Sequence, residues 1–321
     1  MFVPIEYYSN LDEKRKPRKG DILYSVVGSF GIPVLIKDDA PFVFQRHIAI
    51  LRPNPQIIDS RFLFYTMLSC GFYAKADAAA IGAAQRTISL NSLRSIKILL
   101  PSLSVQKHIA DILSAYDDLI ENNQKQIKLL EEAAQRLYKE WFVDLRFPGW
   151  ERATVGSLLR KISRTKQILA CDYQIDGTIP IIDQSRDFIA GYTNNTEARI
   201  ELNEPIIVFG DHTRILKYIT FPFAKGADGT QLIISSSDRM PQSLFYFSLI
   251  HVDLSNYHYA RHFKYLKESV VLVPTRIIAQ SFDSIVQSIM SRIQVLRDNS
   301  FKAIKVRNQL IPKLMSKETE V

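Results

Sequence analysis

One long stretch, residues 102–147, contains neither glycine nor proline. Its apolar residues recur at alternating spacings of three and four, which indicates the buried face of one amphipathic helix. They are Val105, Ile109, Ile112, Tyr116, Leu119, Ile120, Ile127, Leu130, Ala134, Leu137 and Trp141. Ser102 and Ser104 are candidate N-caps. At about 1.5 Å per residue the helix extends roughly 55 Å, so it either joins two domains or packs along a partner helix.

A second stretch with this periodicity begins near Ile278 and extends to about Leu310. Its apolar positions are Phe282, Ile285, Ile289, Ile293, Leu296, Ile304 and Leu310. Pro312 is expected to end the helix, because proline breaks the helical pattern. Two matching helices separated by one domain predict an antiparallel coiled coil. Asn123 lies on the first apolar row, and Asn299 or Ser300 lies near the second. These polar residues either fix the register or face water.

The bulk properties limit the class of protein. A chain of 321 residues suits two domains with connecting elements, and a formal net charge of +8 favours a polyanion such as nucleic acid as partner. No apolar run approaches the ~18 residues of a membrane span, and residues 1–10 lack a signal-peptide pattern. We therefore expect a cytoplasmic protein without membrane contact. Cys70 and Cys171 have no metal-ligand spacing and are expected to be reduced, structural thiols.

The pattern of the first part of the chain predicts an α/β domain. Residues 1–19 are expected to be irregular and basic, and residues 74–84 to be loose. A buried helix is expected at residues 61–70, and strands are expected at residues 20–27, 32–36, 42–51 and 96–100.

The part after Trp150 predicts a second α/β domain. Its strands are expected at residues 202–209, 216–223 and 270–273. A helix is expected at residues 243–250, and a basic, aromatic loop at residues 256–266.

The two parts match each other in order. GDILYSV corresponds to EPIIVFG, RFLFYTML to QSLFYFSL, and GAAQRTISLNSLRSIKILLPS to YARHFKYLKESVVLVPT, and each part then enters a long helix. This order indicates a tandem duplication of one α/β domain plus helix. Residues 151–201 precede the matched strand in the second copy and far fewer precede it in the first, so the first domain is expected to lack its opening portion. The expected boundaries are 1–101, 102–147, 148–275 and 276–321.

These motifs together resemble the specificity subunit of type I restriction–modification systems. The resemblance rests on LLPSLSVQKHIADILSAYDDLIENNQKQIKLLEEAAQRLYKEWFVDL, NQLIPKLMS, GDILYSVVGSFG, FQRHIAILRP, GAAQRTIS, IIVFGDHTR and FAKGADGTQ. It covers nearly the whole chain and departs from the family at the short N-terminal portion. The resemblance implies two target recognition domains that each read half of a split site in double-stranded DNA, and two helices that pair and space the half-sites.

The resemblance also implies the partners. Two methyltransferase subunits dock on the helices and domains, and restriction subunits join to form the nuclease. The specificity subunit itself carries no catalytic centre. From the sequence we also expect no metal site and no cofactor. Two alternatives remain open: a coiled-coil scaffold whose basic loops bind DNA nonspecifically, and an inactive truncated specificity subunit.

Candidate DNA contacts are amide, basic and hydroxyl side chains on loops, because such groups read base edges or bind phosphates. In the first copy they are Gln45, Arg46, His47, Gln85, Arg86 and Thr87. In the second copy they are His212, Thr213, Arg214, Lys225, Gln231, Tyr259, Arg261, His262 and Lys264. The repeat places Arg261 and His262 where the first copy has Gln85 and Arg86. Asp228 either caps a turn with Gly229 or accepts a hydrogen bond from cytosine.

Catalytic classes lack their motifs in this sequence. An N/D-P-P-Y/F tetrapeptide, a P-loop and the Pro-Asp start of a PD…(D/E)-x-K nuclease are all absent. The six histidines and two cysteines form no zinc-binding pattern. We therefore expect a protein that is not an enzyme.

Overall fold

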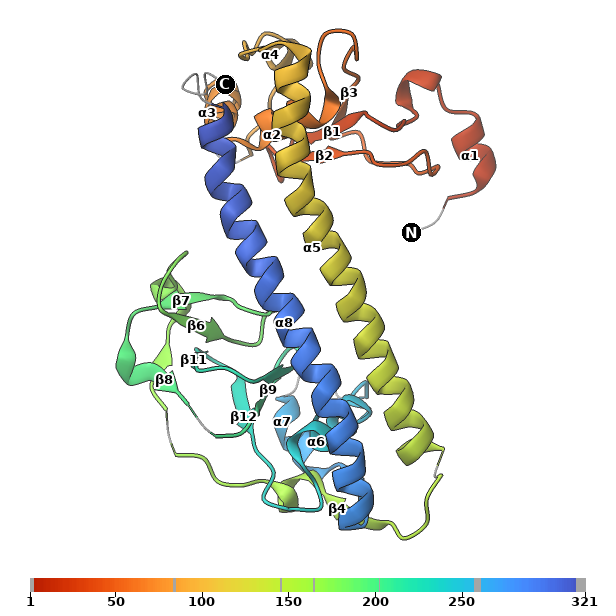
Figure 1. The fold of residues 1–321 in the computed structure, drawn as a ribbon, viewed down its shortest axis with the longest axis vertical. Coiled ribbons are helices and arrows are strands. Elements are labelled where there is room, and N and C mark those ends of the chain that lie inside the picture. The colour runs from red at the N-terminus through yellow and green to blue at the C-terminus, as the bar shows by residue number, and fades with distance from the viewer. Residues whose placement is uncertain are drawn as a thin grey trace. The chain divides into compact units, whose positions relative to one another are not determined.

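The computed structural model describes residues 3–82, 85–144, 146–163, 165–201, 203–256 and 261–315. The chain divides into two compact units: unit 1 is Met1–Lys125 with Arg297–Val321, and unit 2 is Gln126–Leu296. Two long helices, α5 (Leu103–Tyr138) and α8 (Arg276–Met315), each contribute to both units (Figure 1). No helix in the described ranges is both long and apolar enough to cross a membrane.

The long helices form where the apolar periodicity predicts them. Helix α5 has 36 residues and continues into a π-helical turn, Lys139–Val143, and α8 has 40 residues. The expectation that Pro312 ends α8 is wrong, because the helix continues to Met315. Pro312 lies in the last turn, where its missing N–H removes only one bond near a helix end.

The paired segments of α5 and α8 run antiparallel within each unit. In unit 1, Ile109 and Leu113 of α5 pack in one cluster with Ile311 of α8, and in unit 2 Tyr138 packs against Phe282. The expected apolar rows need correction where they place Leu119 and Ile285, which are 44% and 45% exposed. On α8 the neighbouring residues Val286 and Met290 are buried. The buried face shifts in this way because a helix with 3.6 residues per turn drifts away from a strict alternation of three and four.

Two polar residues lie inside the helix pair of unit 1. Asn123 is 3% exposed and Ser300 is 8% exposed, whereas Asn299 faces solvent. The Nδ2 atom of Asn123 has no hydrogen-bond partner among the described residues. Of the two alternatives that the sequence leaves open, the one in which Asn123 and Ser300 face water is therefore wrong.

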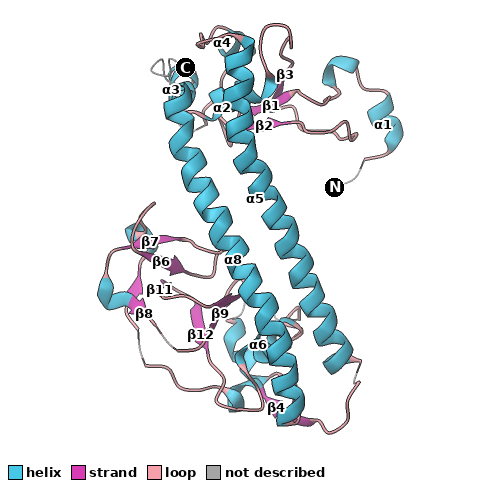
Figure 2. Cartoon of the chain, viewed as in Figure 1, coloured by secondary structure: helices cyan, strands magenta, loops and turns pink. Residues whose placement is uncertain are grey.

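Unit 1 is a small three-stranded sheet covered by short helices (Figure 2). The strands are β1 (Ile22–Ser25), β2 (Pro33–Leu35) and β3 (Ile48–Leu51), in the antiparallel order β2-β1-β3. The helices other than α5 and α8 are α1 (Ile5–Ser9), α2 (Ser60–Leu68), α3 (Cys70–Ala78) and α4 (Leu90–Arg94), with a 3₁₀ turn at Glu13–Arg15.

Three local expectations for unit 1 are wrong. Residues 1–19 contain α1, and the loose segment at residues 74–84 begins inside α3. The side chain of Ser69 caps α3 by accepting from the N–H of Phe72, and alanines favour the helix. No strand forms at residues 96–100.

The two cysteines lie one in each unit. Cys70 and Cys171 are free and exposed, so the expectation that they are structural thiols is wrong for both.

Unit 2 contains three sheets, with one large hydrophobic cluster and two smaller ones that involve the five-stranded sheet. Their orders are β10-β9-β12, β5-β11-β6-β7 with β8 on β11, and β13-β4. The strands are β4 (Glu151–Thr154), β5 (Gln167–Ile168), β6 (Ile179–Ile182), β7 (Gly191–Thr193), β8 (Arg199–Ile200), β9 (Ile206–Gly210), β10 (Leu216–Ile219), β11 (Phe223–Gly226), β12 (Thr230–Ile233) and β13 (Val270–Val273). The helices are α6 (Gln242–Ile250) and α7 (His262–Glu268), and α7 replaces part of the loop expected at residues 256–266.

The duplication is visible in the sheets. Strand β1 lies between β2 and β3 as β9 lies between β10 and β12, and every pairing is antiparallel. The five-stranded sheet and the β13-β4 pair of unit 2 have no counterpart in the described part of unit 1. The segment that corresponds to β13 therefore has no neighbouring strand there, which explains why residues 96–100 form none and leave Leu99 50% exposed.

Candidate nucleic-acid interface

The first candidate cluster of unit 1 lies on a turn. Gln45, Arg46 and His47 are all exposed and precede β3, which begins at Ile48. The expectation that they lie in the middle of a strand is wrong, since the apolar run is ordered as a strand only where β1 pairs with it. Strand alternation therefore does not decide where Arg46 points.

The second candidate cluster of unit 1 is partly occupied by structural contacts. Gln85 is exposed, whereas Arg86 forms an ion pair with Asp77 at 2.8 Å. Thr87 forms β-bridges with Val27 and Ile81. Gln85 is therefore the exposed side chain of this cluster.

The two clusters meet at the end of β1. The backbone N–H of Val26 donates to the carbonyl of His47 at 3.0 Å, and the carbonyl of Val26 accepts from Ile88 at 3.1 Å. The structure thus brings together two segments that lie about forty residues apart in sequence. Exposed Gln45, Arg46, His47 and Gln85 are the side chains presented there.

In unit 2 a turn at residues 210–214 follows β9. Its backbone closes through the N–H of Arg214, which donates to the carbonyl of Gly210 at 2.8 Å, and Arg214 has a φ of 62°. His212, Thr213 and Arg214 are exposed. The Arg214 guanidinium donates to the Leu254 carbonyl at 3.2 Å, so it is anchored within unit 2.

Gln184, which the sequence analysis missed, joins this turn to the next one. Its Oε1 accepts from the backbone N–H of His212 at 3.1 Å, and its Nε2 donates to the carbonyl of Asp228 at 2.9 Å. Gly229 has a φ of +74°, and a Cβ there would lie 2.7 Å from the His212 ring and 2.9 Å from the Gln184 amide. Only glycine therefore fits between the two turns. Sequence gives no signal for Gln184, since Asp183 is the residue that directly follows β6 and the partners of Gln184 lie far away along the chain.

Asp211 holds the start of α7 against the end of β9. It is 4% exposed, and its carboxylate accepts from the backbone N–H of Phe263 at 2.7 Å. Its carbonyl accepts from the backbone N–H of His262 at 2.9 Å and from Nδ1 of the same ring at 2.8 Å. Nδ1 therefore carries the proton, because a carbonyl only accepts.

His262 is consequently a structural residue and not an exposed base reader. It is 6% exposed, and its backbone N–H and ring both donate to the carbonyl of Asp211. Tyr259, another candidate, lies outside the described residues.

The ends of β9, β11 and β12 and the start of α7 surround a polar depression of about 350 Å³. The lining includes four predicted residues and consists of Gln167, Asp211, His212, Lys225, Asp228, Gly229, Thr230, Gln231 and Arg261. Four separate parts of the sequence converge there. The remaining exposed candidates of unit 2, Thr213, Arg214 and Lys264, do not line it.

Lys225 is the least hydrated cation of this depression. It is half-buried, and burial lowers the pKa of its ammonium group below the usual value. Its ammonium forms no hydrogen bond or ion pair within the described ranges. A desolvated cation without a partner is a group that gains from a ligand with acceptor atoms.

A basic groove adjoins the depression. It shares Lys225 and Gln231 with it, and its further lining includes Arg160, Lys161 and Lys267. Sequence analysis missed these three cations: Arg160 and Lys161 lie outside the matched motifs, and Lys267 lies within one but outside its candidate cluster. Together the depression and the groove offer both polar groups for base edges and cations for phosphates.

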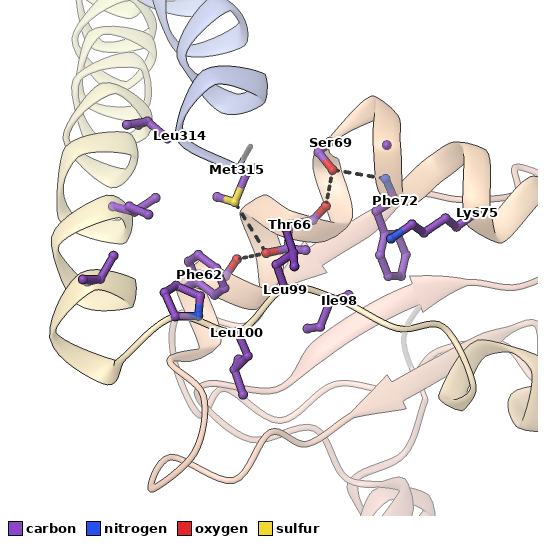
Figure 3. A pocket seen from close by; sticks show the side chains of 14 residues that line it. Phe62, Thr66, Ser69, Phe72, Lys75, Ile98, Leu99, Leu100, Leu314 and Met315 are labelled. Carbon is purple, nitrogen blue, oxygen red and sulfur yellow. Dashed lines mark hydrogen bonds between the residues drawn. The ribbon is translucent and has the colours of Figure 1, made fainter. Parts of the chain in front are cut away.

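Unit 1 has an apolar pocket at a different place (Figure 3). Phe62 and Thr66 of α2, Leu99 and Leu100, and Met315 of α8 line it, and the hydroxyl of Thr66 lies 3.6 Å from the Met315 sulfur. It adjoins the segment whose counterpart in unit 2 pairs with β4. No group of three or more His, Cys, Asp or Glu side chains in the part of the chain that the structure describes is arranged to hold a metal ion.

Comparisons with known proteins agree with this architecture. The family model for the Type I restriction modification DNA specificity domain matches residues 5–132. The chain is 25% identical over 341 residues to the type I restriction enzyme MjaIX specificity subunit of Methanocaldococcus jannaschii, covering 94% of this chain and 78% of that protein. It is 31% identical over 171 residues to the type I restriction enzyme HindI specificity subunit of Haemophilus influenzae, covering 52% of this chain and 37% of that protein.

A solved structure has the same fold. The crystal structure of the Type-I restriction-modification system S subunit from M. genitalium superposes with a TM-score of 0.58 and 17% identity. The match covers 94% of this chain and 84% of that one.

Proposed function

Because the chain belongs to the family of type I restriction–modification DNA specificity subunits, we propose that it selects the DNA sequence on which a methyltransferase and nuclease assembly acts in the cytoplasm. The polar depression of unit 2 carries this proposal. It gathers His212, Lys225, Gln231 and Arg261 from separate segments at the ends of strands. Loop residues held by a rigid scaffold are the usual carriers of recognition.

The second unit supplies one half of the recognition and the first unit the other. In unit 2 the depression contacts base edges, and Arg160, Lys161 and Lys267 of the adjoining groove bind phosphates. In unit 1 the contacts come from Gln45, Arg46, His47 and Gln85 at the end of β1, and Arg86 and Thr87 support that surface. Among the remaining candidates, Thr213, Arg214 and Lys264 contact the DNA backbone from the rim of unit 2.

The partners follow from the family. Two methyltransferase subunits dock on the chain, and restriction subunits join them, while the chain itself performs no chemistry. The part of helix α5 in unit 2 offers a surface for such contacts, since Leu129 on it is 64% exposed.

The decisive experiment maps methylated bases in the genome of a host that carries this chain with its methyltransferase subunit. A motif in two parts separated by a fixed spacer is expected, because two units read two half-sites. A symmetric motif made of one repeated half-site would assign all readout to unit 2 in paired chains. The absence of any sequence-dependent methylation would contradict the proposal.

The salt dependence of binding distinguishes sequence readout from the alternative function, a scaffold that binds DNA nonspecifically. Binding of the full chain to a cognate duplex and to a scrambled duplex is measured at rising salt concentration. Phosphate attraction fades with salt, whereas base contacts remain. Specific readout predicts that the ratio of the two affinities is maintained or increases, and a scaffold predicts a ratio near one throughout.

A further inference from the structure

The depression of unit 2 contains one cation and one anion that do not neutralise each other. Lys225 and Asp228 both line it, yet they form no ion pair, and neither side chain has a hydrogen-bond partner within the described ranges. The carboxylate of Asp228 therefore does not cap the turn with Gly229, which is one of the two roles that the sequence leaves open. Both charges remain available to a ligand.

A third group in the depression also lacks a partner. Thr230 is 2% exposed, and its hydroxyl has no hydrogen-bond partner in the described part of the chain. A buried hydroxyl without a partner costs free energy that a bound polar ligand recovers. This observation is independent of the two charges and points to the same ligand site.

The backbone keeps Asp228 in an uncommon conformation. Its φ of 32° lies in the left-handed region, and Gln184 holds its carbonyl at 2.9 Å. Residues held in this region at a surface depression are associated with ligand contacts, because the surrounding structure must offset the strain. The carboxylate of Asp228 and the ammonium of Lys225 thus line the same depression without forming an ion pair.

The mixture of charges selects among ligands. A phosphate site gathers cations and N–H donors, and a carboxylate in the same site repels the anion. The major-groove edge of a G·C pair presents N7 and O6 of guanine as acceptors and N4–H₂ of cytosine as a donor. An ammonium and a carboxylate that line one depression are complementary to that combination of acceptors and donor.

We propose that this depression reads one G·C base pair in the half-site of unit 2, with Lys225 donating to guanine and Asp228 accepting from cytosine. The assignment rests on the proposed function and names the base pair that this site selects. Thr230 and the free amide of Gln231 complete the polar surface around the pair.

The test uses the full chain and duplexes that carry the mapped half-site. Replacing the guanine by 7-deazaguanine removes N7 and leaves the pairing with cytosine intact. For the wild-type chain, this replacement at one position is expected to weaken binding about tenfold. For Lys225→Met the same replacement is expected to have little further effect, since the partner of N7 is already gone.

Three further variants sharpen the test. Lys225→Arg keeps a positive charge with hydrogen-bond donors at this position. Unlike Lys225→Met, it is therefore expected to retain the preference for guanine. Asp228→Asn is expected to weaken the preference for a G·C pair at the same position of the DNA half-site. Lys264→Met is the matched control, because Lys264 is exposed on α7 outside the depression, and its loss is expected to affect all sequences alike. Thermal unfolding of each variant verifies folding.

The outcomes separate the two proposals. If the wild-type chain discriminates between sequences but Lys225→Met weakens binding to every sequence equally, Lys225 is a phosphate contact and the base assignment is overturned. Relaxation at an A·T position overturns the choice of base pair. Sequence-independent binding by the wild-type chain overturns both this inference and the proposed function.

Discussion

The side-chain amide of Gln184 donates to the carbonyl of Asp228 at 2.9 Å, across forty-four positions of sequence. The same amide group accepts from the backbone of His212 at 3.1 Å. One side chain from the end of β6 therefore fixes both turns that border the polar depression. The shape of the candidate interface depends on a residue that does not line it.

Replacing Gln184 by alanine is expected to loosen both turns. The variant loses two hydrogen bonds, so the free energy of unfolding should fall by about 1–2 kcal/mol. DNA affinity should fall as well, because the polar groups are no longer held in place. Chemical denaturation and duplex binding measure the two effects. Gln135→Ala, at an exposed position of α5, is the control, and an equal response of both variants would argue against the role of Gln184.

Lys225→Met is expected to stabilise unit 2 at neutral pH. Burial lowers the pKa of Lys225 in the folded state, so the unfolded chain binds its proton more tightly. The unfolding free energy of the wild type should therefore rise as pH increases toward about 10.4, the pKa of an unperturbed lysine. The advantage of the variant should shrink over the same range.

Urea denaturation at pH 7 and pH 10 measures this difference. Lys264→Met serves as the comparison, since the Lys264 side chain is exposed and lies outside the depression. A Lys225→Met variant that is less stable than the wild type at pH 7 would show that the ammonium has a partner in the folded protein.

Tyr65→Phe is expected to destabilise unit 1. The Tyr65 hydroxyl donates to the Asp117 carboxylate at 2.6 Å, and Arg307 of α8 pairs with the same carboxylate. A hydrogen bond to a charged group contributes about 1.5–3 kcal/mol, and this one is lost in the variant. Thermal denaturation should show the loss. Tyr73→Phe removes an exposed hydroxyl from α3 and should leave the stability nearly unchanged.

Asn123→Leu is expected to stabilise the helix pair of unit 1 by about 1 kcal/mol. Asn123 is buried, and its Nδ2 has no partner among the described residues, so an apolar side chain of similar volume removes a cost of desolvation. Asn122→Leu, on the exposed face next to it, is the matched control. A clear decrease in melting temperature for Asn123→Leu alone would show that the amide contributes to stability.

The long helices follow from the sequence because their signal is local. Residues three and four apart share one face, so the rows containing Ile109 and Ile293 can be read without knowledge of the partner. Which of two neighbouring apolar residues faces the core does not follow from this spacing alone. Packing buries Val286 and leaves Ile285 exposed. The repeat also anticipates the shared order of the two antiparallel sheets.

The candidate interface follows from the sequence only in part. Lys225, Gln231 and His212 stand out as polar residues at strand ends, and the structure brings them together with Arg261. His262 carries the same polar signal, yet the carbonyl of Asp211 draws it into the interior. Gln184 and Asp211 act through contacts with distant segments, and nothing near them in sequence distinguishes them from other polar residues.

The hydrophobic core of unit 2 is separate from the polar residues proposed to contact DNA, and this has a consequence for heritable variation. The core of unit 2 packs α6 and α8 behind β9, while the residues proposed to meet DNA lie on turns and at strand ends outside that core. Mutations such as Gln231→Asn or Asp228→Glu alter the polar surface without entering that core. A lineage carrying this chain can therefore change its DNA target one substitution at a time, because substitutions outside the core cost little stability.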